Sequence, residues 1–92
     1  MSMSDNSIYK RASYGMDSNS VLKSYNNKVP DKINKIDDLA IWVKNQSSNA
    51  VGFIMHPRFF NTKDPKRYVS AVITLGENKP DISSSWPLYL YK

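Results

Sequence analysis

The second half of the chain contains three apolar stretches joined by connections that are too short for a crossover helix. The stretches span residues 50–56, 68–75 and 86–91, and apolar side chains recur at every second position in each of them. Recurrence with a period of two is typical of a β-strand. Parallel strands need a crossover of about a dozen residues or more, whereas these connections hold about ten. We therefore predict strands that pair in an antiparallel sheet.

Residues 31–46 show the periodicity of a helix instead. The apolar stripe consists of Ile33, Ile36, Leu39, Ala40, Trp42 and Val43, at spacings of mainly three and four residues. Asp31 can cap this helix, whereas Asp37 and Asp38 are not well placed in it for the helix dipole. We predict a helix over residues 31–46. The alternative is a strand over 39–43, because Ile, Trp and Val favour strands.

The first 28 residues are rich in Ser, Asn and Tyr and give weaker signals. Residues 1–6 are expected to be disordered, and residues 8–14 to add an edge strand. The polar run 17–20 can cap one or two helical turns that begin at Val21. Together these elements predict a single α+β domain over residues 1–92, with one helix covering a face of an antiparallel sheet of three or four strands.

The chain contains no cysteine and one histidine, His56. The absence of cysteine excludes disulfides and thiolate metal sites. A zinc site needs three or four nitrogen or sulfur ligands, which one histidine does not supply. The three glycines cannot form a dinucleotide-binding or Walker loop. We therefore predict neither a metal nor a cofactor.

The sequence carries no recognisable localisation signal. The N-terminus is polar, and no run approaches the roughly 18 apolar residues of a membrane span. Small secreted domains usually need disulfides, so we expect a cytoplasmic protein without membrane contact. Many Lys, Asn, Ser and Tyr residues suggest an AT-rich genome. A short chain without cysteine or motif is typical of accessory proteins from phages and mobile elements, so a viral origin is one expectation.

One catalytic pattern occurs in outline. Restriction-type nucleases combine Pro-Asp with Asp/Glu-x-Lys, and Pro30-Asp31 and Glu77-Asn78-Lys79 match these two parts. The chemistry requires both carboxylates within reach of one magnesium ion. Asp31 is better explained as a helix cap and Glu77 as part of a turn. We therefore predict that the protein is not an enzyme and keep a minimal metal-dependent nuclease as a second alternative.

The segment between the first two predicted strands of the second half mixes cations with aromatic rings. The candidate binding residues are Arg58, Phe59, Phe60, Lys63, Lys66 and Arg67, supported by Lys10 and Arg11 in a shorter segment. Cations contact phosphates, and exposed rings stack on unpaired bases. The leading hypothesis is non-enzymatic binding to nucleic acid or to the nucleic-acid-facing cleft of a nucleoprotein complex. The competing interpretation is that both phenylalanines are core residues and that the cations, in a chain of net charge +5, are ordinary surface charge.

The C-terminal stretch offers a second candidate surface. If it forms an edge strand, Trp86, Tyr89 and Tyr91 are candidates for protein contact beside a free backbone edge. This pattern suits an inhibitor of the phage type that docks on a host protein and blocks it, with an acidic face of the host protein as the partner of the basic surface. The competing interpretation is a terminal strand anchored in the core.

Overall fold

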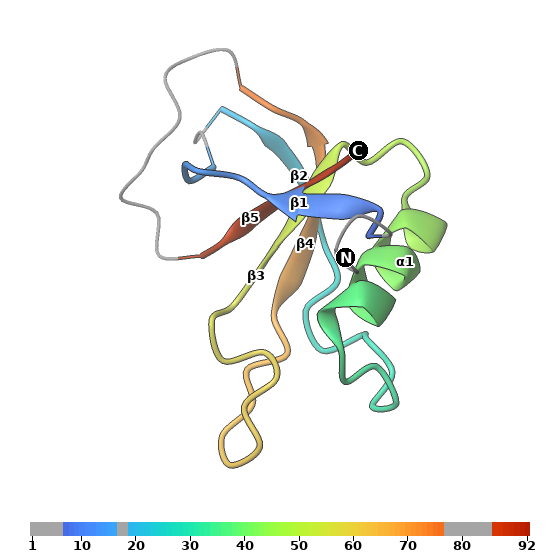
Figure 1. Ribbon diagram of the computed structural model, residues 1–92, viewed down its shortest axis with the longest axis vertical. Coiled ribbons are helices and arrows are strands. Elements are labelled where there is room, and N and C mark those ends of the chain that lie inside the picture. The colour runs from blue at the N-terminus through green and yellow to red at the C-terminus, as the bar shows by residue number, and fades with distance from the viewer. Residues whose placement is uncertain (1–6, 17–18, 77–85) are drawn as a thin grey trace, which may run out of the picture.

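The computed structural model describes residues 7–16, 19–76 and 86–92, and these form one helix and five strands (Figure 1). In chain order the elements are β1 (Tyr9–Arg11), β2 (Val21–Ser24), α1 (Ile36–Gln46), β3 (Gly52–Met55), β4 (Val69–Thr74) and β5 (Leu88–Tyr91). All pairings are antiparallel, in the order β1-β5-β3-β4-β2. The predicted α+β class and antiparallel pairing are confirmed, but the sheet has five strands rather than three or four. The expected disorder of residues 1–6 lies outside the described residues.

Both edges of the sheet come from the N-terminal part of the chain. β1 lies within the predicted edge strand 8–14 and pairs with β5 alone. β2 replaces the helical turns predicted from Val21, so that prediction is wrong. The cause is non-local, because β2 pairs with β4, and the N–H of Tyr25 extends the ladder to the carbonyl of Val69 over 2.9 Å. Part of the expected cap, residues 17–18, lies outside the described residues.

β5 lies inside the sheet, between β1 and β3. The condition for the second candidate surface, that the C-terminal stretch forms an edge strand, is therefore not met, because β1 occupies its outer side, and the competing interpretation of a terminal strand anchored in the core holds. Gly52 of β3 permits the close approach of β5, since a Cβ at this position would collide with the backbone oxygen of Tyr89 and touch the side chain of Leu90. The backbone of Tyr89 is thus enclosed by two neighbouring strands.

α1 begins at Ile36 and not at residue 31. The N-cap residue is Lys35, whose extended backbone (φ −132°, ψ 146°) makes no side-chain cap bond, so Asp31 does not cap the helix. The preceding residues form a turn in which the N–H of Ile33 donates to the carbonyl of Pro30 over 3.0 Å. The strand alternative for 39–43 is wrong, because these residues are helical.

The later start changes the role of two carboxylates. Asp37 and Asp38 lie in the first turn of α1, where negative charge interacts favourably with the helix dipole, so the interpretation that they are poorly placed for it is wrong. Lys44 lies in the last turn, where positive charge is favoured.

Among the described residues no helix has the length and apolar character needed to cross a membrane.

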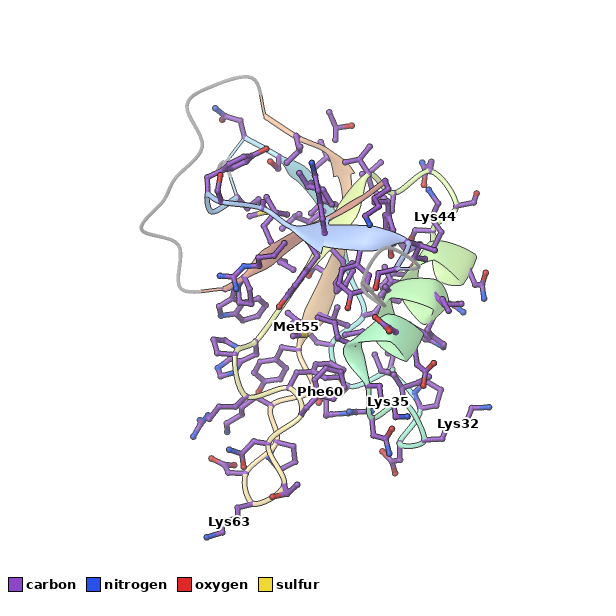
Figure 2. The ribbon with its side chains drawn as sticks, viewed as in Figure 1. Lys32, Lys35, Lys44, Met55, Phe60 and Lys63 are labelled. Carbon is purple, nitrogen blue, oxygen red and sulfur yellow. The ribbon has the colours of Figure 1, made fainter. Side chains whose placement is uncertain are left out.

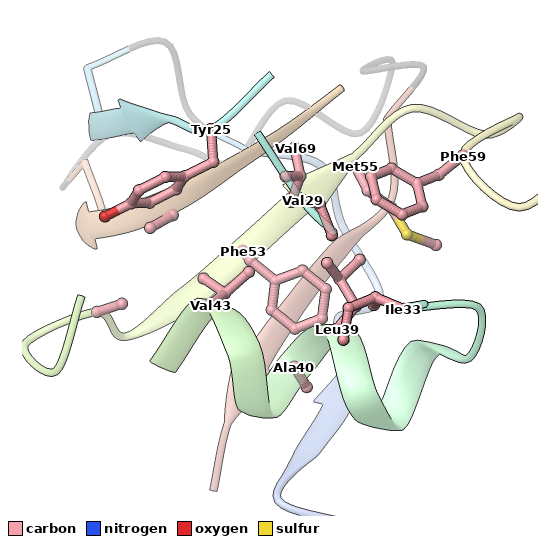
Figure 3. Packing of buried hydrophobic residues seen from close by; sticks show 12 residues of the cluster. Tyr25, Val29, Ile33, Leu39, Ala40, Val43, Phe53, Met55, Phe59 and Val69 are labelled. Atoms are coloured by element: carbon pink, nitrogen blue, oxygen red, sulfur yellow. The ribbon is translucent and has the colours of Figure 1, made fainter. Parts of the chain in front are cut away.

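Buried residues cover both faces of the sheet. The larger cluster lies between the sheet and α1 and contains the fully buried Leu39, Val43, Phe53, Phe59 and Val69 (Figure 3). A smaller cluster on the opposite face consists of Ala12, Ile54, Val72 and Leu88. β3 is buried along its whole length because it contributes side chains to both clusters.

A layer of tyrosines joins the sheet to the helix. The ring of Tyr89 stacks on Phe53 with centroids 5.1 Å apart, and Tyr9 meets Tyr89 edge to face at 5.7 Å. The hydroxyl of Tyr91 donates to the carbonyl of Ala40 over 2.7 Å, and that of Tyr9 donates to Asp37 Oδ1 over 2.6 Å. The neighbouring strands β1 and β5 are therefore both joined to α1 by tyrosine hydrogen bonds.

Shortening a buried side chain of α1 should lower the stability of the fold. We expect Leu39→Ala to lower the free energy of unfolding by about 2–5 kcal/mol, because it leaves a cavity in the larger cluster. Ile41 lies on the same helix with 48% of its surface exposed, and Ile41→Ala should change stability by about 0.5 kcal/mol or less. Urea unfolding followed by circular dichroism measures both variants. Equal losses would contradict this packing.

The tyrosine layer should lose stability in alkali. Burial raises the pKa of Tyr91 above its ordinary value, and burial together with the hydrogen bond to Asp37 raises the pKa of Tyr9 to about 12. A raised folded-state pKa gives stability that is complete below pH 10 or so and declines as the pH rises toward the folded value. Tyr91→Phe should cost about 0.5–1.5 kcal/mol at neutral pH and lose less stability between pH 8 and 11 than the wild type. Urea midpoints at both pH values test this expectation.

Candidate functional site

Residues 57–67, here called the β3–β4 loop, carry the six cationic and aromatic residues singled out in the sequence. The loop projects beyond the sheet (Figure 1). Its root is closed by the N–H of His56, which donates to the carbonyl of Tyr68 over 2.9 Å. Near its tip, Asn61 Oδ1 accepts the N–H groups of Lys63 and Asp64, each over 2.8 Å. These local bonds give the loop a defined shape.

The two phenylalanines of the loop have different environments. Phe59 is 0% exposed and belongs to the larger core cluster, so the interpretation as a core residue holds for it. Phe60 is half-buried and meets Phe59 edge to face, with ring centroids 4.8 Å apart. Phe60 therefore keeps part of its ring at the surface while its core contact fixes its orientation.

Arg67 has a structural role at the end of the loop. Its Nη1 donates to the carbonyl of Ile33 over 3.0 Å, and its Nη2 donates to the carbonyl of Pro30 over 2.8 Å. The guanidinium also lies 4.4 Å from the centroid of the Phe59 ring, a cation–π contact. These contacts fasten the segment before α1 to the β3–β4 loop. Two of the donors of Arg67 are consequently engaged within the protein.

A groove lies between residues 31–35 and the β3–β4 loop, and we call it the loop groove. Its volume is about 540 Å³. The lining residues are Asp31, Asn34 and Lys35 from the segment before α1, and Phe59, Phe60, Asn61, Thr62, Pro65 and Arg67 from the loop. Figure 2 shows Phe60 between the part of the loop that ends in Lys63 and the segment that carries Lys35. An aromatic ring with amides and cations around it is thus open to a ligand.

The remaining loop cations differ in how free they are. Arg58 Nη1 lies 2.9 Å from Asp64 Oδ2, and Lys66 Nζ lies 3.9 Å from the other oxygen of the same carboxylate. One negative charge is therefore shared by two cations, in exposed pairs that contribute little to stability. The Lys63 side chain makes no ion pair with any described residue. With four cations and Asp64 as its single carboxylate, the loop as a whole carries a net positive charge.

The other sequence candidates lie away from the loop groove. Lys10 is exposed on β1, and the Arg11 guanidinium lies 5.7 Å from the centroid of the Tyr89 ring. Tyr89 and Tyr91 pack against the cluster beneath α1, whereas Trp86 packs against the cluster on the opposite face. The three residues considered for protein contact therefore do not share one surface.

Asn34, Lys35 and Thr62 are groove residues that sequence reasoning missed. Residues 31–35 were assigned to the helix, which would have placed their side chains on a regular helical surface. Asn34 is a poor helix former and gave the one available signal against that assignment. The bonds from Arg67 that shape this segment join positions more than thirty residues apart and leave no local pattern.

Most side chains that line the loop groove are groups that can bind a ligand rather than groups that commonly act as nucleophiles or general bases. His56 is not among its lining residues, and its Nδ1 accepts the backbone N–H of Arg58 over 3.0 Å. Within residues 7–16, 19–76 and 86–92, no cluster of three His, Asp or Glu side chains could hold a metal ion. Glu77, the partner of Asp31 in the nuclease pattern, lies outside the described residues.

Comparison with protein-family models found no match, and neither did searches of curated proteins and of solved structures. The function is therefore inferred from the geometry of the chain itself.

The structural role of Arg67 is testable. Arg67→Lys keeps the positive charge but cannot span two carbonyls and cover the Phe59 ring. We expect the free energy of unfolding to fall by about 1–3 kcal/mol, because partly buried carbonyl acceptors lose charged donors. Lys63→Ala removes an exposed cation of the same loop and should change stability by about 0.5 kcal/mol or less. Denaturant unfolding that gave equal stabilities for both variants would contradict this role.

Proposed function

We propose that the protein is a non-enzymatic binding protein that holds single-stranded nucleic acid in the loop groove. The observation that carries the proposal is the partly exposed ring of Phe60 in a groove lined by Lys35, Asn34, Asn61 and Thr62. An unpaired base stacks on Phe60, because every base has an aromatic face. The phosphates on either side of it lie near Lys35 and Lys63.

The size and chemistry of the groove support this proposal. A volume of about 540 Å³ lies within the usual range for ligand sites of roughly 300–1,000 Å³. The amides of Asn34 and Asn61 and the hydroxyl of Thr62 both donate and accept, so they suit the edges of a splayed-out base. Duplex stacking would hide the base faces that Phe60 needs, which favours single strands.

The charge distribution supports the same ligand. The chain has a net charge of +5, and Asp31 is the single acidic residue among the lining residues. A positive surface attracts a phosphate backbone, and each phosphate contact releases counterions. The engaged donors of Arg67 make Lys35 and Lys63 the better candidates for phosphate contact.

The salt dependence of binding tests the cations. We expect Lys35→Ala and Lys63→Ala each to reduce the slope of log affinity against log salt by about 0.7, the value for one phosphate contact on a single strand. Lys92→Ala is the matched control, because it removes one exposed lysine at the C-terminus, far from the loop (Figure 1), and should leave the slope unchanged. Fluorescence anisotropy of labelled oligothymidine of about twelve nucleotides gives these slopes.

Phe60→Leu is the companion variant for the stacking contribution. Loss of one stacked base should weaken binding roughly 5- to 150-fold, corresponding to about 1–3 kcal/mol, without changing the salt slope. Thermal unfolding of each variant controls for the packing of Phe60 on Phe59. If the folded wild-type protein does not bind at low salt, the proposal fails, and docking of the basic loop on an acidic protein face becomes the better explanation.

A further inference from the structure

Three aromatic side chains gather at the root of the β3–β4 loop, and we call them the root cluster: His56, Tyr68 and Trp86. The His56 ring centroid lies 5.6 Å from that of Trp86 and 5.9 Å from that of Tyr68. Tyr68 and Trp86 are nearly parallel, with centroids 6.4 Å apart and an interplanar angle of 19°. All three side chains are half-buried.

The root cluster lies on the face of the sheet opposite α1. Met55 and Val69 point into the cluster beneath α1, and side chains alternate along a strand, so His56 and Tyr68 point the other way. Trp86 packs against the smaller cluster on that face. The loop groove lies beside the segment before α1, so one loop separates two aromatic sites.

Three polar atoms of the root cluster make no hydrogen bond to a described residue. His56 Nδ1 accepts the N–H of Arg58, so the neutral ring carries its proton on Nε2. Throughout the described part of the chain, no protein hydrogen bond engages His56 Nε2, the Tyr68 hydroxyl or the Trp86 indole N–H. Half-buried donors of this kind normally find an acceptor, which a ligand can supply.

Two arginines are each linked to one member of the root cluster. Trp86 shares a cavity of about 240 Å³ with Arg11, Ser13 and Tyr14, and no carboxylate belongs to its lining. Arg58, whose backbone binds His56, has a side chain that is 48% exposed. Its guanidinium pairs with Asp64, whereas the Arg11 guanidinium lies over the Tyr89 ring on the face of the sheet that α1 covers. Stacking on the rings, and not contact with a cation, is therefore what the root cluster offers a ligand.

We propose that the root cluster is a second base-binding site, in which an unpaired base stacks on the rings of the cluster. The inference rests on the proposed function and deepens it, because the ligand becomes a strand that passes around the β3–β4 loop and contacts both of its sides. Flat rings on which a base can stack suit a nucleotide, whereas an acidic peptide offers no base to stack on them.

Tryptophan fluorescence tests the second site directly. Trp42→Phe leaves Trp86 as the sole tryptophan and keeps an aromatic ring against Tyr25. We expect oligothymidine of about twelve nucleotides to quench Trp86 emission with the same midpoint as the anisotropy titration, because a stacked base quenches indole. Quenching should persist, at higher oligonucleotide concentration, when Phe60→Leu is added to this variant. Polyglutamate, an acidic polymer without bases, is the control and should not quench.

The outcomes separate the two proposals. Binding by anisotropy with unchanged Trp86 emission would overturn the second site and leave the loop groove standing, as would equal quenching by polyglutamate. Absence of binding in both measurements would overturn the proposed function and the second site together.

Discussion

The bridge made by Arg67 determines the shape of the region where we place the ligand. One guanidinium binds two carbonyls of the segment before α1 and covers the ring of Phe59. A planar cation with several fixed donors can do this, whereas the flexible ammonium of lysine cannot. The bridge holds residues 30–35 in a turn, delays the start of α1 to Ile36 and sets one wall of the loop groove at a fixed distance from the other. Arg67, which the sequence suggested as a binding residue, thus has a structural role and shapes the groove.

The position of β5 has a similar effect on the rest of the molecule. Because β5 lies between β1 and β3, its tyrosines point under α1 and its remaining side chains build the smaller cluster on the other face. This arrangement removes Tyr89 and Tyr91 from the surface proposed for protein contact and leaves Trp86 beside the root of the loop. The short strands β1 and β2 are left as the edges of the sheet.

The two proposed sites would bind a base in the same way, by stacking on an aromatic ring. Each presents an aromatic ring that packing holds in place, Phe60 on one side of the loop and Trp86 on the other. Rings fixed by packing lose little entropy on stacking, so they bind better than flexible ones. The β3–β4 loop is well suited to present both sites because its own hydrogen bonds define its shape.

The sequence by itself determined the class of the fold, the three strands of the second half and the body of the helix, because these depend on local periodicity and on short connections. It also located the loop that carries the candidate residues. Tertiary structure alone decided that β2 is a strand, that β5 is internal, and which of Phe59 and Phe60 is buried. The reason is that each of these outcomes depends on partners far along the chain: β4 for β2, β1 for β5, and the larger core cluster for Phe59. Hydrogen bonds and burial between distant segments override weak local preferences and leave no periodic pattern from which they could be predicted.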